Sequence, residues 1–183
     1  MALSPQKIKQ LAERLRKAEE TGVAIEPIRD QMQPGDIAGA YAIQKANTQY
    51  WVRKGRRVVG CKIGLTAKSV QKQLGVDQPD YGVIFADRVM CDGEEVALSR
   101  VMQPKVEAEV ALVLEKDLKK KDISISELIS AVAYAVPAIE IVGSRIANWN
   151  IKIQDTIADN ASGGLVVLCN EPKRLQGLDL RLC

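Results

Sequence analysis

Two glutamates stand two positions apart in a segment that alternates between apolar and polar residues. Across residues 105–115 every second residue is apolar, and Glu107 and Glu109 occupy positions between them. A period of two predicts a β-strand. Both carboxylates therefore leave the same face of the strand, with their stems about 6.6 to 6.8 Å apart. From that spacing the two side chains can converge on one cation.

A third glutamate lies in an apolar run. Glu140 has an isoleucine on each side, within residues 138–142, which we predict to form another strand. A lone charge there is costly unless it is paired or binds a metal. Three carboxylates without histidine would form an all-oxygen site, which suits magnesium or manganese better than zinc. The alternative is that Glu107 and Glu109 line a solvated face and pair with lysines, as most strand glutamates do, and their spacing alone leaves this open.

One lysine and one aspartate are candidates for acid–base chemistry. Lys62 lies between Gly60 and Gly64 in a predicted strand, and glycine lets a ligand or another backbone approach closely. A lysine there can hold a carboxylate or transfer a proton, and the alternative is a surface lysine with a buried stem. Asp80 follows Pro79 in a turn-rich loop, where an aspartate usually shapes the turn.

The polar segment 155–164 contains Asp155, Asp159 and Asn160. Side chains of these types commonly bond to nearby backbone, which is the ordinary explanation for such a cluster. The two glycines at its end do not form a phosphate loop, because the pattern G-x-x-x-x-G-K-[ST] is absent.

Histidine is absent from the sequence, and the four cysteines are scattered. No catalytic triad, imidazole base or imidazole metal ligand can therefore be built. Cys61, Cys91, Cys169 and Cys183 form no C-x-x-C pair, so a zinc knuckle or thioredoxin-type motif is not expected. The chemistry of an enzyme with this sequence must depend on carboxylates, lysines and hydroxyls, with or without a hard cation.

The overall composition is that of an ordinary globular domain. The chain has 183 residues, with 46% hydrophobic and 27% charged residues and a net charge of +3. This length favours one domain. The charge is too small to indicate a nucleic-acid partner, and no apolar run is long enough for a membrane helix. The N-terminus lacks the apolar core of an export signal. We therefore expect a cytoplasmic protein with neither a nucleic-acid nor a membrane partner.

We expect helices before residue 57 and mainly strands after it. Helical spacing with end signals predicts two N-terminal helices, over 5–21 and from Asp36 to Gly55. The rest is rich in strands, which predicts an α+β domain. After residue 57 we expect strands at 58–63, 83–85, 105–115, 138–142, 150–154 and 165–169, a short helix at 66–74, and a helix that begins at a capping box, Ser124 to Glu127, and ends before Pro137.

The last residues also alternate. Leu178, Leu180 and Leu182 are separated by polar residues or cysteine, which predicts a strand that is still in progress at Cys183. An uncovered apolar strand edge promotes aggregation. We expect either further chain or a neighbouring subunit to cover this edge.

Several motifs occur in a fixed order along the chain. They are VGCKIGLT at 59–66, QLGVDQPDYG at 73–82, QPKVEAE at 103–109, PAIE at 137–140, GSRI at 143–146 and DTIADNAS at 155–162. Together they resemble the 2-hydroxypenta-2,4-dienoate hydratases (2-keto-4-pentenoate hydratases), a group within the fumarylacetoacetate hydrolase superfamily. The resemblance runs nearly from end to end of the sequence.

The resemblance implies a fold of the fumarylacetoacetate hydrolase type, a mixed β-roll with flanking helices. Residues 1–56 would form the N-terminal helical region and 57–183 the β-roll catalytic region, together one domain. Chains of this family continue well beyond the residue that matches Cys183, and their C-terminal part completes the roll and adds pocket residues. We therefore expect a C-terminal part of the fold to be missing from these 183 residues.

The resemblance also assigns roles to individual residues. Matched motif by motif, the family's ligands for a divalent cation, Mg²⁺ or Mn²⁺, fall on Glu107, Glu109 and Glu140. Lys62 matches the active-site lysine and Asp80 the aspartate of the Gln-Pro-Asp loop. The substrate-binding positions implied in the same way are Lys62, Leu65, Asp155, Asn160 and Ser162.

The implied activity is the metal-dependent hydration of 2-hydroxypenta-2,4-dienoate (2-oxopent-4-enoate) to 4-hydroxy-2-oxopentanoate in the meta-cleavage catabolism of aromatic compounds. The substrate is a small 2-oxo or 2-hydroxydienoate acid. Members of the family form homo-oligomers, pentamers or decamers, and association with other enzymes of the pathway is a further expectation.

Two other functions fit the same residues. The related 2-oxo-3-hexenedioate (4-oxalocrotonate) decarboxylases share the three-glutamate site, but they lack an acid at the position of Asp80, which favours the hydratase. The second alternative is a non-catalytic, truncated subunit that serves only in assembly. Magnesium-dependent stabilisation without turnover would favour that second alternative.

Overall fold

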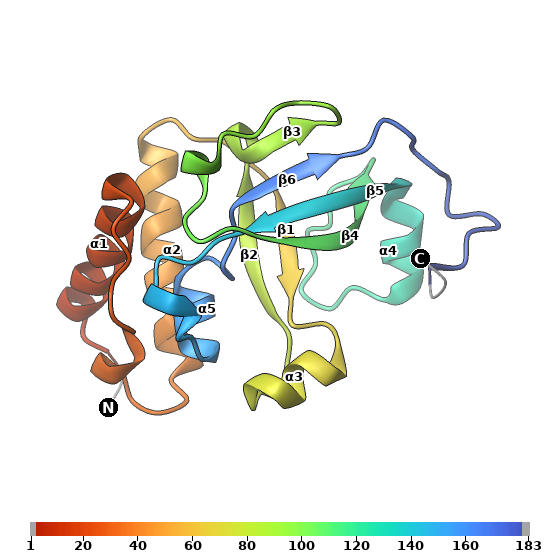
Figure 1. Ribbon diagram of the computed structural model, residues 1–183. Helices are drawn as coiled ribbons and strands as arrows, with labels where there is room; N and C mark the ends of the chain where they lie inside the picture. The colour runs from red at the N-terminus through yellow and green to blue at the C-terminus, as the bar shows by residue number, and fades with distance from the viewer. Residues whose placement is uncertain (1–2, 181–183) are drawn as a thin grey trace.

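A computed structural model describes residues 3–180, apart from the side chains at 73 and 74. The two expected N-terminal helices are present as α1 (Pro5–Thr21) and α2 (Ile37–Arg53). The Ser4 hydroxyl caps α1 by accepting a hydrogen bond from the Lys7 amide, and Gly22 ends the helix in the left-handed conformation. Figure 1 shows α1 and α2 side by side on one flank of the molecule.

The strands form a two-stranded and a four-stranded sheet among the described residues. In the first, β1 (Val58–Gly64) pairs antiparallel with β2 (Asp80–Phe85). The second has the order β3-β6-β5-β4, in which β3 and β6 are parallel and the other pairs antiparallel. Its strands are β3 (Val89–Cys91), β4 (Lys105–Leu114), β5 (Val132–Val142) and β6 (Leu165–Leu168). An α+β fold is therefore confirmed.

The remaining helices are short. Among them, α3 lies at the tip of the β1–β2 pair and α4 directly precedes β5 (Figure 1). Their bounds are α3 (Lys68–Leu74), α4 (Ile125–Ala131) and α5 (Ile153–Ala158), with 3₁₀ turns at Arg29–Gln31, Ala86–Arg88, Leu98–Arg100 and Ala147–Trp149. Within the described part of the chain, no helix combines the length and apolarity that a membrane span requires. The described cysteines, Cys61, Cys91 and Cys169, are free thiols.

The main hydrophobic core joins the N-terminal helices to a segment far along the chain. Leu11 and Leu15 of α1 and Ile43 of α2 pack with Ile146 and with Ile157 of α5, and all five side chains are buried. Removing such side chains from water stabilises the fold by about 1.5–3 kcal/mol each. The core therefore fixes α5, and the loop that follows it, against the helical flank.

Several element boundaries differ from the sequence predictions. The helix that begins at Ser124 ends at Ala131, because residues 132–142 form the long strand β5, which pairs with β4 through Pro137. The expected strand at 150–154 is wrong, since α5 already begins at Ile153. The short strand β3 has no counterpart in the predictions. Asp80 is the first residue of β2 and not part of the preceding loop.

The predicted C-terminal strand is wrong over its described part. Residues 178–180 contain no strand and end in a 3₁₀ turn, while residues 181–183 of that prediction lie outside the described residues. Leu180 is exposed, and a longer row of exposed apolar side chains lies along β4, at Val106, Val110, Leu112 and Leu114.

The structure places Asp155 differently from the expectation of a substrate contact. Its carboxylate is fully buried and accepts hydrogen bonds from the amides of Ile28, Arg29 and Lys152, at 3.0 Å each, and from the Arg29 guanidinium at 2.6 Å. Three of these four bonds come from the connection between α1 and α2, and the fourth comes from Lys152 at the N-terminus of α5. The hydrogen bonds of Asp155 therefore link that connection to α5.

We expect Asp155→Ala to lower the free energy of unfolding by about 3–5 kcal/mol, because it leaves a partly buried guanidinium and several amides unpaired. Urea denaturation measures this loss. The exposed Asp92 provides the control, and Asp92→Ala should change stability by no more than about 0.5 kcal/mol. Equal stability of the two variants would show that the buried contacts of Asp155 carry no net stabilisation.

Candidate metal centre

Two neighbouring strands bring the three glutamates together. Glu107 on β4 stands directly opposite Glu140 on β5, and Glu109 lies two residues further along β4 on the same face. One carboxylate oxygen from each of the three residues lies within 4.8 Å of the others. The predicted convergence of these side chains is thus confirmed. Their role as metal ligands stays a prediction.

The electrostatics of the three carboxylates favour a cation. Glu140 is 4% exposed, while Glu107 and Glu109 are exposed. Burial raises the pKa of Glu140, the nearby Lys62 ammonium opposes the rise, and the charges of Glu107 and Glu109 add to it. Burial likewise raises the pKa of Glu109, and the charge of Glu107 raises it further. Three carboxylates beside one ammonium leave an excess of negative charge, and an oxygen-only donor set fits Mg²⁺ or Mn²⁺.

Lys62 reaches the glutamates from the other sheet. Its ammonium Nζ lies 3.1 Å from Oε2 of Glu140 and donates a hydrogen bond of 2.8 Å to the Ala161 carbonyl oxygen. The side chain is 9% exposed, which rules out the alternative of a surface lysine. This ion pair connects β1 to β5 at the candidate site.

Asp80 lies next to Lys62, across the β1–β2 pair. It is 3% exposed and stands opposite Gly64 in register. A Cβ atom at position 64 would lie 2.3 Å from Oδ1 of Asp80 and 3.7 Å from Nζ of Lys62. The absence of a side chain at Gly64 therefore creates the space that the Asp80 carboxylate occupies. Burial raises the pKa of Asp80, against the opposing effects of the Lys62 ammonium and the Thr156 hydroxyl.

The other predicted substrate-binding residues differ in whether their polar groups are already hydrogen-bonded within the protein. The side chain of Asn160 bonds to both backbone groups of Val83 on β2, at 2.8 and 2.9 Å. Ser162 is 7% exposed, and its hydroxyl has no hydrogen-bond partner among the described residues. The Leu65 backbone is left-handed, at φ 57°, and its carbonyl accepts a bond from Gln71. Of these three residues, Ser162 alone has a buried side-chain group left free for a ligand.

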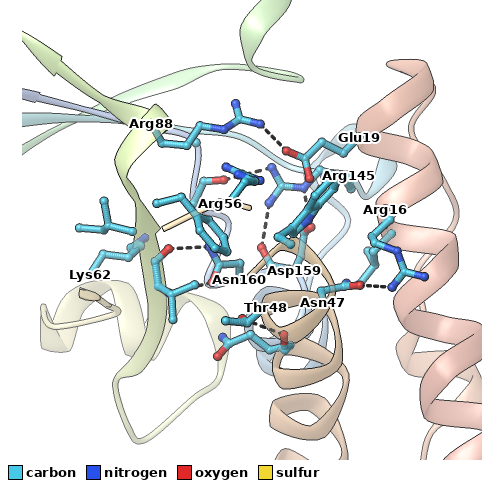
Figure 2. Close-up of a pocket in the computed structure, with 18 of the residues that line it drawn as sticks. Arg16, Glu19, Asn47, Thr48, Arg56, Lys62, Arg88, Arg145, Asp159 and Asn160 are labelled. Carbon is cyan, nitrogen blue, oxygen red and sulfur yellow. Dashed lines mark hydrogen bonds and ion pairs between the residues drawn. The ribbon is translucent and has the colours of Figure 1, made fainter. Parts of the chain in front are cut away.

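A cavity of about 70 Å³ lies behind Lys62, between the two N-terminal helices and the strands. Figure 2 shows Lys62 on one side of it and Arg16 and Asn47, which belong to the helices, on the other. Ligand pockets usually measure about 300–1,000 Å³. This cavity is therefore too small for a typical ligand and is sized for a few water molecules.

Sequence reasoning missed the residues that support this site. Thr156 beside Asp80, and the buried ion pair of Arg145 with Asp159, received no role of their own. A signal existed for Arg145, since it lies in the GSRI motif, and for Asp159, in the polar segment after Asp155. Their partners are distant in sequence, so spacing alone does not predict these contacts.

Comparison with known proteins gives several close relatives, although no protein-family model matches the chain. The chain is 55% identical to a TodF product hydratase of Pseudomonas putida, over 95% of this chain and 65% of the relative. It is 53% identical to a 2-keto-4-pentenoate hydratase of Burkholderia vietnamiensis, over 96% of this chain and 67% of the relative. It is 37% identical to a 2-hydroxypent-2,4-dienoate hydratase of Pseudomonas putida, over 96% and 80%.

A solved structure shares the fold closely. The 4-oxalocrotonate decarboxylase from Pseudomonas putida G7, complexed with magnesium and adipate, superposes with a TM-score of 0.92 and 29% identity. The match covers 98% of this chain and 68% of the decarboxylase. Fold and site together define an α+β protein with three convergent carboxylates. The chain belongs to the 2-keto-4-pentenoate hydratase family, and it spans about two thirds of the length of the first relatives it matches.

We expect Mg²⁺ to stabilise the purified protein against heat, and the double variant Glu107→Gln/Glu109→Gln to lose this effect because two of the three charged donors are gone. A saturating ion, at 100 times its dissociation constant, adds about 2.7 kcal/mol. Differential scanning fluorimetry with and without Mg²⁺ measures the shift. Glu13→Gln/Glu20→Gln, which alters two exposed glutamates of α1, is the matched control. An unchanged Mg²⁺ response in the Glu107/Glu109 variant would exclude these two residues as ligands.

Proposed function

We propose that this protein catalyses the metal-dependent hydration of 2-hydroxypenta-2,4-dienoate to 4-hydroxy-2-oxopentanoate, a step of meta-cleavage catabolism of aromatic compounds. The observation that carries the proposal is the convergence of three carboxylates within 4.8 Å beside Lys62 and the buried Asp80. Membership of the hydratase family supports the reaction type. The magnesium and calcium named for the solved decarboxylases support a divalent cation, which we propose is Mg²⁺ or Mn²⁺.

The proposed cation would be held by Glu107, Glu109 and Glu140. When bound, it would supply Lewis-acid polarisation of the carboxylate and 2-oxygen of the substrate. Glu140 fits this role because it is buried and its carboxylate oxygen lies 3.1 Å from the ammonium of Lys62. The oxygen-only ligand set matches the preference of Mg²⁺ and Mn²⁺.

Lys62 and Asp80 would carry the proton chemistry. The Lys62 ammonium can stabilise negative charge that develops on the 2-oxygen, or hold the substrate carboxylate. Burial raises the pKa of Asp80 above its ordinary value, which is the direction that favours a carboxyl group as a proton donor. As the 2-hydroxyl loses its proton, Asp80 would protonate C5 at the far end of the dienol, which gives a conjugated 2-oxo acid. Asp80 would then orient the water whose oxygen adds at C4 while a proton is delivered to C3. The unpaired Ser162 hydroxyl would accept or donate a bond to the substrate.

The architecture of the whole protein is also proposed. Residues 1–56 and 57–183 would form one domain, which the shared core of α1, α2, Ile146 and α5 supports. The fold would be the mixed β-roll of the fumarylacetoacetate hydrolase superfamily, located in the cytoplasm. The exposed apolar side chains of β4 support its coverage by further chain or by a second copy in a homo-oligomer, a pentamer or decamer.

The decarboxylase remains a second candidate, because the solved 4-oxalocrotonate decarboxylase has the same fold with a TM-score of 0.92. The two reactions are distinguished by supplying each substrate to the purified protein with Mg²⁺. We expect 2-hydroxypenta-2,4-dienoate to be consumed, with 4-hydroxy-2-oxopentanoate detected by NMR, and no release of carbon dioxide from 2-oxo-3-hexenedioate. Release of carbon dioxide without hydration would favour the decarboxylase. Mg²⁺-dependent stabilisation with neither reaction would favour a non-catalytic subunit.

We expect Gly64→Ala to lower the hydration rate constant kcat about 100-fold, since a displacement of about 1 Å at a reacting group has an effect of this size. The added methyl group would displace the Asp80 carboxylate, with which it would collide at 2.3 Å. Gly60→Ala on the same strand is the matched control, because its Cβ would meet its nearest neighbour, Ile84, at 3.9 Å. Steady-state kinetics measure both variants. Equal kcat values would show that the position of Asp80 does not limit the reaction.

A further inference from the structure

The turn between α5 and β6 has an unusual backbone. Asn160, Ala161 and Ser162 are all left-handed, with φ values of 57°, 52° and 53°, and none of them is glycine. Residues with a side chain adopt this conformation at a cost, and normally one at a time. A strained run persists only where its surroundings hold it in place, and such runs cluster at functional sites.

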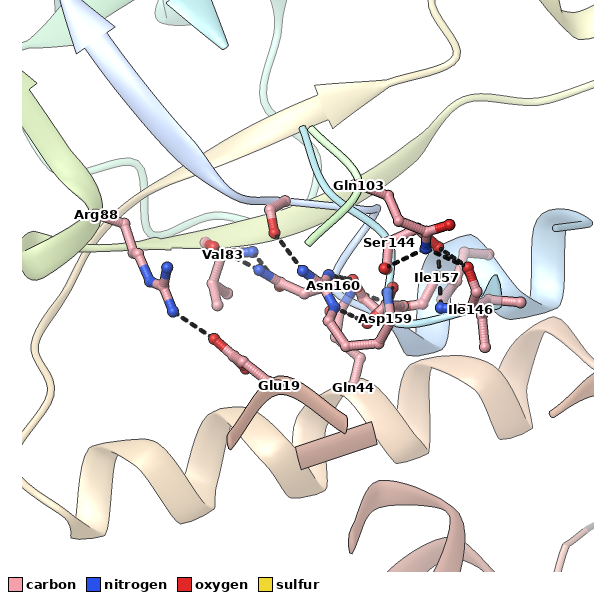
Figure 3. A network of polar contacts seen from close by, with 12 residues as sticks. Glu19, Gln44, Val83, Arg88, Gln103, Ser144, Ile146, Ile157, Asp159 and Asn160 are labelled. Atoms are coloured by element: carbon pink, nitrogen blue, oxygen red, sulfur yellow. Dashed lines mark hydrogen bonds and ion pairs between the residues drawn. The ribbon is translucent and has the colours of Figure 1, made fainter. Parts of the chain in front are cut away.

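Arg145 forms hydrogen bonds to both ends of this turn. Its amide and Nε donate to the Asp159 carboxylate at 3.0 and 2.5 Å, and Nη2 donates to the Asp159 carbonyl at 2.8 Å. Nη1 donates to the carbonyl of Gly163 at 3.1 Å. One buried side chain therefore binds the residue before the turn and the residue after it. Figure 3 shows Asp159 and Asn160 at the centre of this network.

The turn also forms hydrogen bonds with a strand of one sheet and with a residue next to the other. The Asn160 side chain forms hydrogen bonds to both backbone groups of Val83 on β2, and the amide of Gly143, next to the end of β5, donates to the carbonyl of Ser162 at 2.8 Å. A Cβ atom at Gly82 would lie 2.3 Å from the carbonyl oxygen of Asn160. The close approach of the turn to β2 therefore requires glycine at position 82.

The middle of the turn presents one carbonyl to the candidate site. The Ala161 oxygen accepts the 2.8 Å hydrogen bond from Lys62, whose ammonium is 3.1 Å from Glu140. A lysine side chain is long and flexible, with a charge that no rigid group orients. The Ala161 carbonyl and the Glu140 carboxylate together determine where the ammonium lies.

We propose that Arg145 is a positioning residue for Lys62. Together with Asp159, it holds the left-handed turn so that the Ala161 carbonyl fixes the Lys62 ammonium beside Glu140. Arg145 acts through the turn and forms no direct contact with the reacting groups. The inference deepens the proposed function, on which it rests for the catalytic role of Lys62.

The test compares two buried arginine–aspartate pairs. Arg145→Lys keeps the charge beside Asp159 but loses the planar fork that binds both ends of the turn. Arg29→Lys is the matched control, because Arg29 pairs with the buried Asp155 and the hydrogen bonds it donates among the described residues go to Asp155 and Asn150, not to the turn at 160–162. Arg145→Gln and Arg29→Gln extend the series where they fold. Two measurements are made on each purified variant: steady-state kinetics of hydration, and the rate at which acetic anhydride labels Lys62, read by mass spectrometry.

We expect Arg145→Lys to lower kcat about 100-fold while KM changes less than about threefold, because the loss is one of positioning. Lys62 should be labelled severalfold faster than in the unmodified protein, since its ammonium is no longer held. Arg29→Lys should change neither quantity beyond its effect on the folded fraction.

Two results would overturn the inference: the same kcat in the Arg145→Lys and Arg29→Lys variants, or an unchanged labelling rate of Lys62 in Arg145→Lys. The second measurement does not require turnover. If the unmodified protein hydrates no dienoate, the proposed function fails, while the labelling contrast between the two lysine variants still decides whether Arg145 positions Lys62.

Discussion

The burial of one carboxylate constrains the whole candidate site. Glu140 lies near the C-terminal end of β5 with 4% of its surface exposed, and a buried charge of this kind is costly unless an opposite charge compensates it. The compensation comes from the other sheet, where Lys62 on β1 brings its ammonium to 3.1 Å. The two sheets are therefore linked at the point where Glu107 and Glu109 also converge. The unbalanced negative charge that remains is what a divalent cation would neutralise.

Two further ion pairs support the elements around the candidate site. The pair of Arg29 and Asp155 fastens α5 to the helical flank, and the pair of Arg145 and Asp159 fastens the loop that follows α5. Buried pairs of this kind add little net stability over apolar packing, but loss of one partner is strongly destabilising. The directional bonds of the second pair, from Arg145 to Asp159 and Gly163, fix the turn that contacts Lys62.

The hydratase family and the solved decarboxylase are named for different reactions. A chain of this family and a decarboxylase share one fold, at 29% identity and a TM-score of 0.92. Fold alone therefore does not distinguish addition of water from loss of carbon dioxide. The distinction must depend on individual side chains, and the buried Asp80 beside Lys62 is the best placed of them for a separate proton transfer.

The sequence by itself determined the parts of this protein that depend on local spacing. The alternation in residues 105–115 placed Glu107 and Glu109 on one face, and the end signals at Ser4 and Gly22 located the first helix. Local preference does not predict the boundaries near Ala131 and Ile153, because pairing with β4 and packing against the helical flank override it.

Only the tertiary structure decided which distant residues meet. It brought Lys62 to Glu140 and Arg145 to Asp159, and it paired the Asp155 carboxylate with Ile28, Arg29 and Lys152. The physical reason is that a residue's type and neighbours determine what it can bind, whereas its actual partner depends on how the sheets and helices pack.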